Sequence, residues 1–236
     1  MPLAAHGVTH PGRRPTNEDA LLVDAGRGLF VVADGMGGHN AGEVASELAV
    51  QTMGAFFRDG APHTSARLDQ AIKAANDQIL AVAAGQVDYA GMGTTVVAAL
   101  LNDDLSFFAN VGDSRAYVWH SGVLKRLTRD DSWVSAAMEG APEVLANIEH
   151  HPMRHVLTKV VGLRPELEPS LVEFEFGIGD VLLLCTDGVH GALNDVSLGE
   201  VMGSGQSVAD IAEAIVATAI ARGATDNVTA IVVRRE

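Results

Sequence analysis

Five aspartates in this sequence stand where their carboxylates could act together. Four lie at an end of an apolar, strand-like run: Asp34 closes LFVVADG, Asp113 closes LSFFANVGD, Asp187 closes DVLLLCTDG, and Asp226 precedes NVTAIVVRR. The fifth, Asp19, lies in the polar turn RPTNEDA, just before the short apolar run ALLV. A carboxylate at the mouth of a buried strand is costly to desolvate unless a positive partner meets it. Five of them, spread from one end of the chain to the other, indicate one converging site, and a cluster of divalent cations is the simplest partner.

The type of ligand narrows the choice of metal. No Cys–His spacing typical of zinc is present, and the only cysteine, Cys185, lies inside the apolar run VLLLC. Carboxylate oxygens suit hard cations, namely Mg²⁺, Mn²⁺ or Ca²⁺. The sequence has no calcium loop of the EF-hand type. Aspartates from distant segments therefore favour a hydrolytic centre with two metal ions.

Runs of apolar residues predict the elements that would carry these aspartates. Strands are expected at 20–24, 29–34, 93–101, 105–111, 114–119, 171–176, 180–186 and 228–234, with a hairpin from 114–119 into VLKRL. Helical spacing predicts helices at 41–58, 65–84 and 207–222, the second with Ser65 as its N-cap. Hairpin-linked strands with helices grouped apart favour an α+β fold with mostly antiparallel sheets.

Residues 128–166 differ from the rest of the chain. They carry short helical patterns, three prolines and the histidines His150, His151 and His155. We interpret this segment as an excursion beside the sheet, and its histidines as surface or local packing residues and not as a metal cluster.

Composition restricts the functional class. The chain has 236 residues, 47% of them hydrophobic and 19% charged, which suffices for one well-buried domain over 1–236, although length alone also allows two small ones. The formal charge of -14 disfavours nonspecific binding to nucleic acid or anionic membranes. A single cysteine excludes an internal disulfide and fits a reducing compartment. With no visible secretory signal and no apolar run near the roughly 18 residues of a membrane span, we expect a soluble cytoplasmic protein, and a monomer.

Six motifs occur in an order that resembles a known family. RPTNEDA, VVADGMGGHNAGEVAS, GMGTTVVAALL, FFANVGDSRAY, LLLCTDGV and ATDNVTAIVV are similar to the metal-dependent serine/threonine protein phosphatases of the 2C type, in their compact bacterial form. The resemblance covers roughly residues 6 to 234. It implies a four-layer α-β-β-α sandwich with a metal site at one end of two central sheets, and it makes residues 128–166 the flap beside that site.

The resemblance also implies roles for single residues. Asp34 would bridge two Mn²⁺ or Mg²⁺ ions, with the Gly35 carbonyl on one of them. Asp187 and Asp226 would complete this site, and Asp19 would bind directly or through water. Asp113 matches the position of a third, weaker metal in bacterial members, and Arg14 matches the arginine that holds the substrate phosphate. Glu18 would take an outer role similar to that of Asp19.

One position departs from the pattern of many eukaryotic members. Those read DGHGG, and the histidine is proposed as general acid, whereas this chain has Met36 there and a histidine three residues later, His39. The leaving oxygen could take its proton from His39 or from a metal-bound water, and His39 could equally be a solvated loop residue. Thr94 and Thr95 are interpreted as strand formers, with a hydrogen-bonding role at the site as the alternative.

The chemistry of these residues suits hydrolysis of a phosphate monoester. A water between two divalent ions is acidified and positioned for in-line attack. Arg14 offers a planar fork of donors that matches two phosphate oxygens, which lysine would not reproduce. We therefore predict a protein serine/threonine phosphatase that acts on phosphorylated proteins and opposes a bacterial Ser/Thr kinase.

Two other classes stay open. The same fold could serve as a regulatory domain that binds phosphoprotein without turnover, or as a phosphatase for small phosphorylated metabolites. An aspartyl-phosphate mechanism fits less well, because the nucleophile motif DxDx[TV] is missing from the sequence.

Overall fold

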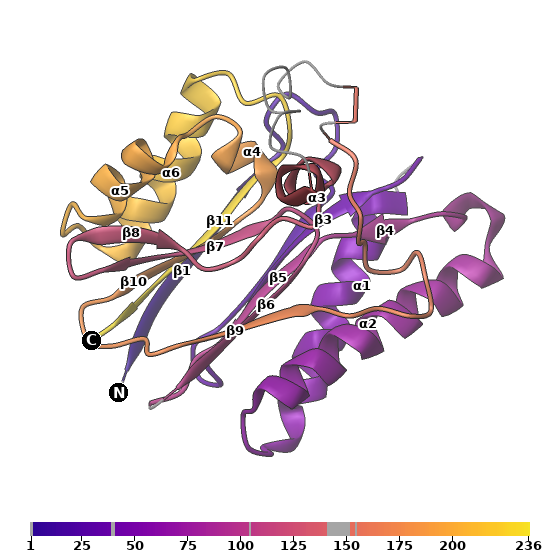
Figure 1. The fold of residues 1–236 in the computed structure, drawn as a ribbon, viewed down its shortest axis with the longest axis horizontal. Helices are drawn as coiled ribbons and strands as arrows, with labels where there is room; N and C mark the ends of the chain where they lie inside the picture. The colour runs from indigo at the N-terminus through magenta and orange to yellow at the C-terminus, as the bar shows by residue number, and fades with distance from the viewer. Residues whose placement is uncertain (1, 39–40, 104, 141–151, 154) are drawn as a thin grey trace.

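The computed structural model describes residues 2–38, 41–103, 105–140, 152–153 and 155–236. Two antiparallel sheets form its centre (Figure 1). The first has the order β1-β11-β10-β7-β8, formed by Leu3–His10, Val228–Arg235, Val181–Cys185, Arg115–His120 and Val123–Arg126. The second has the order β2-β3-β5-β6-β9, formed by Asp19–Asp24, Leu29–Met36, Val96–Leu100, Ser106–Val111 and Ser170–Phe174, and the short β4, Gly93–Thr94, pairs with β3.

Helices cover the outer face of each sheet. The long helices α1, Ala41–Phe56, and α2, Ser65–Gly85, lie against the second sheet, and α5, Asp195–Met202, and α6, Val208–Ala221, lie against the first (Figure 1). The short α4, Asp187–His190, follows β10 directly. Two 3₁₀ turns, η1 at Phe57–Asp59 and η2 at Val87–Tyr89, follow α1 and α2. The predicted α+β fold with four layers is confirmed.

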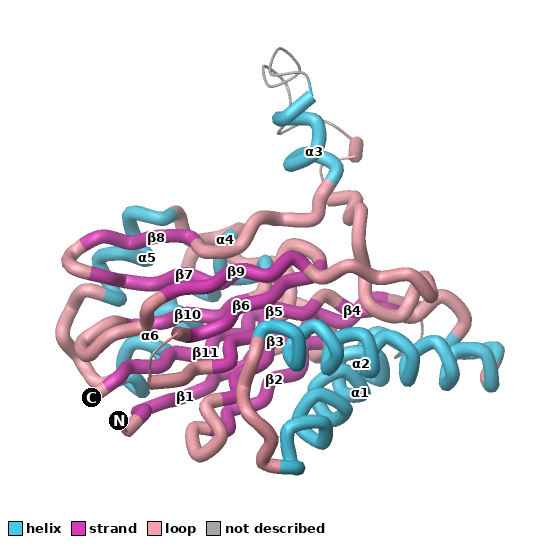
Figure 2. The backbone as a smooth tube through the Cα atoms, turned by 60° about the horizontal axis from the view of Figure 1, so that its bottom comes forward, coloured by secondary structure: helices cyan, strands magenta, loops and turns pink. Residues whose placement is uncertain are grey.

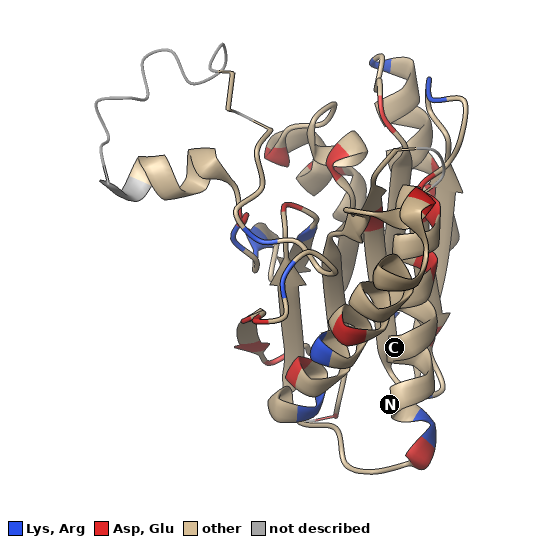
Figure 3. Cartoon of the chain, turned by 90° about the vertical axis from the view of Figure 1, so that its right-hand side faces the viewer, with Lys and Arg blue, Asp and Glu red and all other residues tan. Residues whose placement is uncertain are grey.

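Alternating side chains along the strands explain the three apolar layers. In β3, Leu29 and Val31 pack toward α1 and α2, while Phe30 and Val32 enter the layer between the sheets. The strands β10 and β11 divide their side chains in the same way between the helices α5 and α6 and the space between the sheets. Because a strand places successive side chains on opposite faces, the apolar run of each of these three strands contributes to two cores. The charged residues lie mostly on helices and loops, as Figure 3 shows.

Several details differ from the expectations drawn from the sequence. The expected strand 93–101 is interrupted at Thr95, whose N–H donates to the Asp34 carbonyl at 2.9 Å. Ser65 is the first helical residue of α2 and not its N-cap, because the Thr64 side chain accepts the Arg67 N–H. The strand β1 and the helices α4 and α5 were not expected.

The segment after β8 leaves the layered body. The helix α3, Trp133–Gly140, stands away from the sheets in Figure 2. The chain returns beside the second sheet, where Val161 forms an isolated bridge with Thr94. None of the helices that the structure describes has the length and apolarity needed to span a membrane.

Candidate active site

The structure brings the five predicted aspartates to one end of the two sheets. The β2–β3 pairing sets Asp19 opposite Asp34. Asp34, Asp113, Asp187 and Asp226 line one pocket of about 250 Å³. The pocket also includes Arg14, Glu18 and Gly35. Residues separated by up to 212 positions in the sequence therefore share a single cavity.

Asp19 is held from the opposite sheet. Its Oδ2 accepts hydrogen bonds from the hydroxyls of Thr229, at 2.6 Å, and Thr186, at 3.0 Å, while its Oδ1 is buried without a hydrogen-bond partner. Burial raises the pKa of Asp19 to about 7, since it outweighs the two hydroxyl donors, and the charges of Asp187 and Asp226 raise the pKa further. The second oxygen is thus free to bind a cation.

Asp34 is fixed through its backbone. Its N–H donates to Thr95 Oγ1 at 3.0 Å, and its carbonyl accepts from Thr94 Oγ1 at 2.9 Å. Thr95 Oγ1 lies 2.7 Å from Ser114 Oγ. Both threonines therefore support the site, which was only the alternative interpretation of their sequence. Burial, followed by the charges of the other four aspartates, raises the pKa of Asp34 well above its ordinary value.

Asp113 and Asp187 begin the segments that follow two strands. Asp113 comes after Gly112, whose φ of 97° lets the chain turn at the end of β6. Burial and then the charge of Asp187 raise the pKa of Asp113 to about 7. Asp187 is the first residue of α4, and its Oδ1 is buried without a hydrogen-bond partner. Burial and the charge of Asp226 raise the pKa of Asp187.

Asp226 and Arg14 form an ion pair at the rim of the pocket. Nη2 of Arg14 lies 2.7 Å from Asp226 Oδ2, and the arginine side chain is 53% exposed. The ion pair with Asp226 raises the pKa of Arg14. Because the pair is half-exposed, it is a weak interaction that keeps Arg14 at the pocket. Another anion could compete with Asp226 for the guanidinium.

Gly35 occupies a position that only glycine can fill. A Cβ at this residue would lie 2.0 Å from the Gly42 carbonyl oxygen and 2.6 Å from the Glu18 carbonyl oxygen. The Gly35 N–H donates to the same Glu18 carbonyl at 3.0 Å. The backbone of β3 therefore passes between two other backbone segments directly beside Asp34.

Gly35→Ala is expected to destabilise the protein by about 2–3 kcal/mol, since backbone atoms must move to admit the methyl group. Urea unfolding in the presence of chelator measures this cost without a contribution from metal binding. Gly38→Ala is the control, because a Cβ there meets nothing within 4 Å. Equal unfolding midpoints for the two variants would contradict the close approach at Gly35.

The donor set fits divalent cations. Two buried carboxylate oxygens, Asp19 Oδ1 and Asp187 Oδ1, have no hydrogen-bond partner, and four carboxyl groups have raised pKa values because they lie together out of water. Bound cations would satisfy the oxygens and offset the repulsion. Among the described residues, no three acidic, histidine or cysteine side chains lie close enough together to bind a single ion. The Asp226 carboxylate instead accepts a hydrogen bond from Arg14. Mg²⁺ commonly binds through one or two carboxylates and keeps several waters, so this arrangement suits it.

Sequence reasoning missed the residue that joins the two ends of the chain at this site. The Asn227 side chain donates to the carbonyls of Pro11, at 3.0 Å, and Thr16, at 2.9 Å, and accepts the Glu18 N–H at 2.8 Å. It thereby holds the loop that carries Arg14 against the start of β11. Its place beside Asp226 in the motif ATDNVTAIVV was the available signal.

Histidines at the site also differ from expectation. His190 in α4 is half-buried, and desolvation lowers its pKa to about 3. Its Nε2, 3.0 Å from the Asp113 carbonyl, therefore holds that loop as a neutral donor. His155, interpreted from the sequence as a surface or packing residue, lines the pocket of the aspartates. His39, His150 and His151 lie outside the described residues.

Known proteins resemble this chain over most of its length. The family model described as protein phosphatase 2C matches residues 6–226. The chain is 32% identical over 213 residues to the serine/threonine phosphatase stp of Listeria monocytogenes, with 88% of this chain and 84% of that protein covered.

Solved structures show the same fold. The crystal structure of the Mycobacterium tuberculosis serine/threonine phosphatase PstP/Ppp has a TM-score of 0.92 and 33% identity, with 100% of each chain covered. The catalytic domain of PstP in complex with two manganese ions has a TM-score of 0.88 and 33% identity, with 99% of this chain and 98% of that chain covered.

Proposed function

Because this chain belongs to the protein phosphatase 2C family, we propose that it hydrolyses phosphoserine and phosphothreonine in proteins with the aid of divalent cations. One observation carries the proposal: a single pocket holds four aspartates next to the half-exposed guanidinium of Arg14. Anionic oxygens for cations and a planar donor for phosphate are the two parts that such a reaction requires.

The chain supplies the cation ligands in fixed positions. Asp34, Asp187 and Asp226 and the Gly35 carbonyl would hold two Mn²⁺ or Mg²⁺ ions, and Asp19 would bind them directly or through water. When bound, the cations would supply Lewis acidity that acidifies a water and offsets the charge of the phosphate. A third, weaker ion at Asp113 is a further part of the proposal, supported by the place of Asp113 in the same pocket.

Other residues orient the reaction. The Thr186 and Thr229 hydroxyls donate to one oxygen of Asp19, so that the other oxygen stays available. Arg14 would bind two phosphate oxygens, and a cation at Asp226 would compete for the carboxylate that now pairs with it. For the proton of the leaving oxygen, His155 joins His39 and water as a candidate, since it lines the pocket.

The remaining parts of the proposal concern the cellular setting. The substrates would be phosphoproteins produced by a bacterial Ser/Thr kinase, and residues 128–166 would form a flap beside the site. The cytoplasmic location and the monomeric state inferred from the sequence stay predictions.

Hydrolysis of a phosphothreonine peptide tests the proposed function directly. We expect turnover with Mn²⁺, none with chelator, and none with the Asp187→Asn variant. A folded wild type loaded with Mn²⁺ that binds the peptide without turnover would favour a regulatory binding domain. Faster turnover of sugar phosphates than of phosphopeptides would favour a metabolite phosphatase.

Arg14→Lys is expected to raise KM for a phosphopeptide about tenfold and to change kcat less, because an ammonium cannot reproduce the bidentate fork. Steady-state kinetics at saturating Mn²⁺ measure both constants. Arg58→Lys is the control, since Arg58 is exposed at the far end of α1. An unchanged KM in Arg14→Lys would remove Arg14 from the phosphate site.

A further inference from the structure

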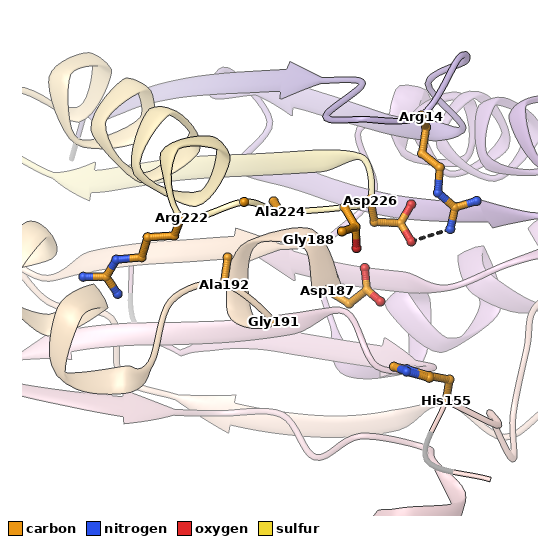
Figure 4. A pocket seen from close by; sticks show the side chains of 11 residues that line it. Arg14, His155, Asp187, Gly188, Gly191, Ala192, Arg222, Ala224 and Asp226 are labelled. Carbon is orange, nitrogen blue, oxygen red and sulfur yellow. Dashed lines mark hydrogen bonds and ion pairs between the residues drawn. The ribbon is translucent and has the colours of Figure 1, made fainter. Parts of the chain in front are cut away.

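A second and larger cavity adjoins the aspartates. It has a volume of about 520 Å³ and shares Arg14, His155, Asp187 and Asp226 with the metal pocket. From there it extends along α4 and the turn between α6 and β11, as far as Arg222. In Figure 4, Arg14 and Arg222 stand at opposite ends of the lining residues, with Gly188, Ala192 and Ala224 between them. We call this cavity the Arg222 groove.

The floor of the Arg222 groove is made of small residues. Gly188, Gly191, Ala192 and Ala224 lie between Arg14 and Arg222 in Figure 4, and Gly223 also lines the groove. A Cβ at Gly188 would lie 2.0 Å from the Asn227 carbonyl oxygen, and Gly223 has a φ of 89°, so local backbone geometry favours glycine at both positions. The result is an open channel that leaves room for an extended peptide next to the phosphate site.

The charges in the Arg222 groove are divided between its ends. Its lining acids, Asp187 and Asp226, are at the metal end, where bound cations would neutralise them. The far end is basic: Arg222 lines it, and a Cβ at Gly223 would lie 3.4 Å from Nη2 of Arg13. This local excess of positive charge occurs in a protein with a formal charge of -14.

The Arg222 guanidinium uses only part of its hydrogen-bonding capacity within the described residues. It is exposed at the C-terminal end of α6, and its Nη1 donates to Ser197 Oγ at 3.1 Å. Among the residues that the structure describes, no carboxylate forms an ion pair with it. A guanidinium carries five N–H donors, so a neutral hydroxyl leaves most of its capacity, and all of its charge, unused.

We propose that Arg222 binds an anionic group on the substrate, a carboxylate or a second phosphate, located a few residues from the phosphoserine or phosphothreonine that is hydrolysed. This inference rests on the proposed function and defines its substrate class as phosphoproteins with an acidic flank. Arg14 and the cations hold the reacting phosphate, the small residues admit the intervening peptide, and Arg222, with Arg13 nearby, receives the second anion. Arg222 is thus a specificity-determining residue and takes no part in the chemical step.

A purely structural role for Arg222 makes a different prediction. A cation at a helix C-terminus interacts favourably with the helix dipole, and the contact with Ser197 links α6 to α5. In that case a substitution would lower the melting temperature and would affect all substrates alike. Only an anion-binding role changes the ratio of rates between acidic and neutral peptides.

The test compares kcat/KM for phosphothreonine peptides at saturating Mn²⁺. One peptide has neutral flanks, a second set carries one glutamate moved along either flank, and a third set carries a phosphoserine at the same positions. For the wild type we expect about a three- to tenfold preference for the acidic peptides at one position, the range of a charge-assisted contact at an exposed site. A preference for phosphoserine alone would identify the second anion as a phosphate.

Three variants assign the preference to Arg222. Arg222→Gln should bring the ratio of acidic to neutral peptide to about one, and Arg222→Glu should invert it. Ser197→Ala removes the contact of Arg222 with α5 and keeps the charge, and Arg58→Glu makes the same charge change at a distant exposed site, so both should retain the preference. Melting temperatures establish that the variants are folded.

Two results would overturn the inference, and they have different consequences for the proposed function. Wild-type hydrolysis of all peptides at equal kcat/KM, or a preference that survives in Arg222→Gln and Arg222→Glu, would reject the Arg222 site and leave the proposed function standing. Failure of the wild type to hydrolyse any phosphothreonine peptide would reject the proposed function, and the substrate class with it.

Discussion

Asparagine in place of Asp34 is expected to lower kcat/KM for a phosphothreonine peptide by about a thousandfold or more, while it raises the melting temperature of the metal-free protein. Activity falls because Asp34 is one of the carboxylates that would hold the two cations. An amide keeps the shape but provides no charge, and several kcal/mol of charge stabilisation are lost.

The metal-free variant is expected to be more stable than the wild type, because the buried Asp34 carboxylate destabilises the folded wild-type protein. Burial and the charges of four other aspartates raise its pKa well above the ordinary value, so its ionised form is unfavourable without metal. Its backbone bonds to Thr94 and Thr95 do not depend on the side-chain charge. We expect Asp34→Asn to gain on the order of 1–2 kcal/mol in the presence of chelator, which is a few degrees for a chain of this length.

Thermal unfolding with chelator and with Mn²⁺ checks both effects together. The wild type should be stabilised by Mn²⁺, whereas Asp34→Asn should be stabilised less. Asp77→Asn makes the same chemical change at an exposed position of α2 and should leave activity and melting temperature as in the wild type. An Asp34→Asn variant that keeps wild-type activity, or that is less stable than the wild type in chelator, would contradict the proposed role of Asp34 in holding the cations.

The elements that sequence reasoning identified are those with strong patterns. The apolar runs of β3, β10 and β11 are buried on both faces, and the stripe Leu68, Ile72, Ala75 and Ile79 of α2 is fully buried, as its spacing predicts. The strand β1 was missed because it is an edge strand whose residues are nearly all half-buried on both faces, so its sequence LAAHGVTH lacks a clear period.

The site was predictable as a set of carboxylates but not as a network. Asp34 and Asp187 could be identified because each follows an apolar run in its own segment. A carboxylate in that position is costly to desolvate unless a positive partner meets it. Asn227 and the pair of threonines on Asp19 could not, since a hydroxyl or amide in a strand has many ordinary roles. Their function depends on which distant segment the fold sets opposite them, which is a property of tertiary register and not of local pattern.

The pH dependence of stability follows from the same cluster, and its sign is opposite to that of ordinary surface carboxylates. Asp19 and Asp113 have folded-state pKa values of about 7, against 3.8 when unperturbed. Between these values the folded protein binds more protons than the unfolded chain. Stability therefore decreases as the pH rises, and the loss extends from about pH 4 to just above pH 7.

Metal binding should reverse this trend, because cations bind the ionised carboxylates and displace their protons. In chelator, we expect the melting temperature to fall as the pH rises through this window, and with saturating Mn²⁺ we expect the stabilisation over chelator to grow over the same range. Measurements at matched ionic strength separate this effect from general screening of the net charge of -14. Asp113→Asn provides the matched variant, since it removes one of the two groups and should flatten the slope in chelator. A metal-free protein whose stability rises steadily from pH 4 to pH 8 would show that these carboxylates are ionised and satisfied without cations, and that the pocket is not a metal site.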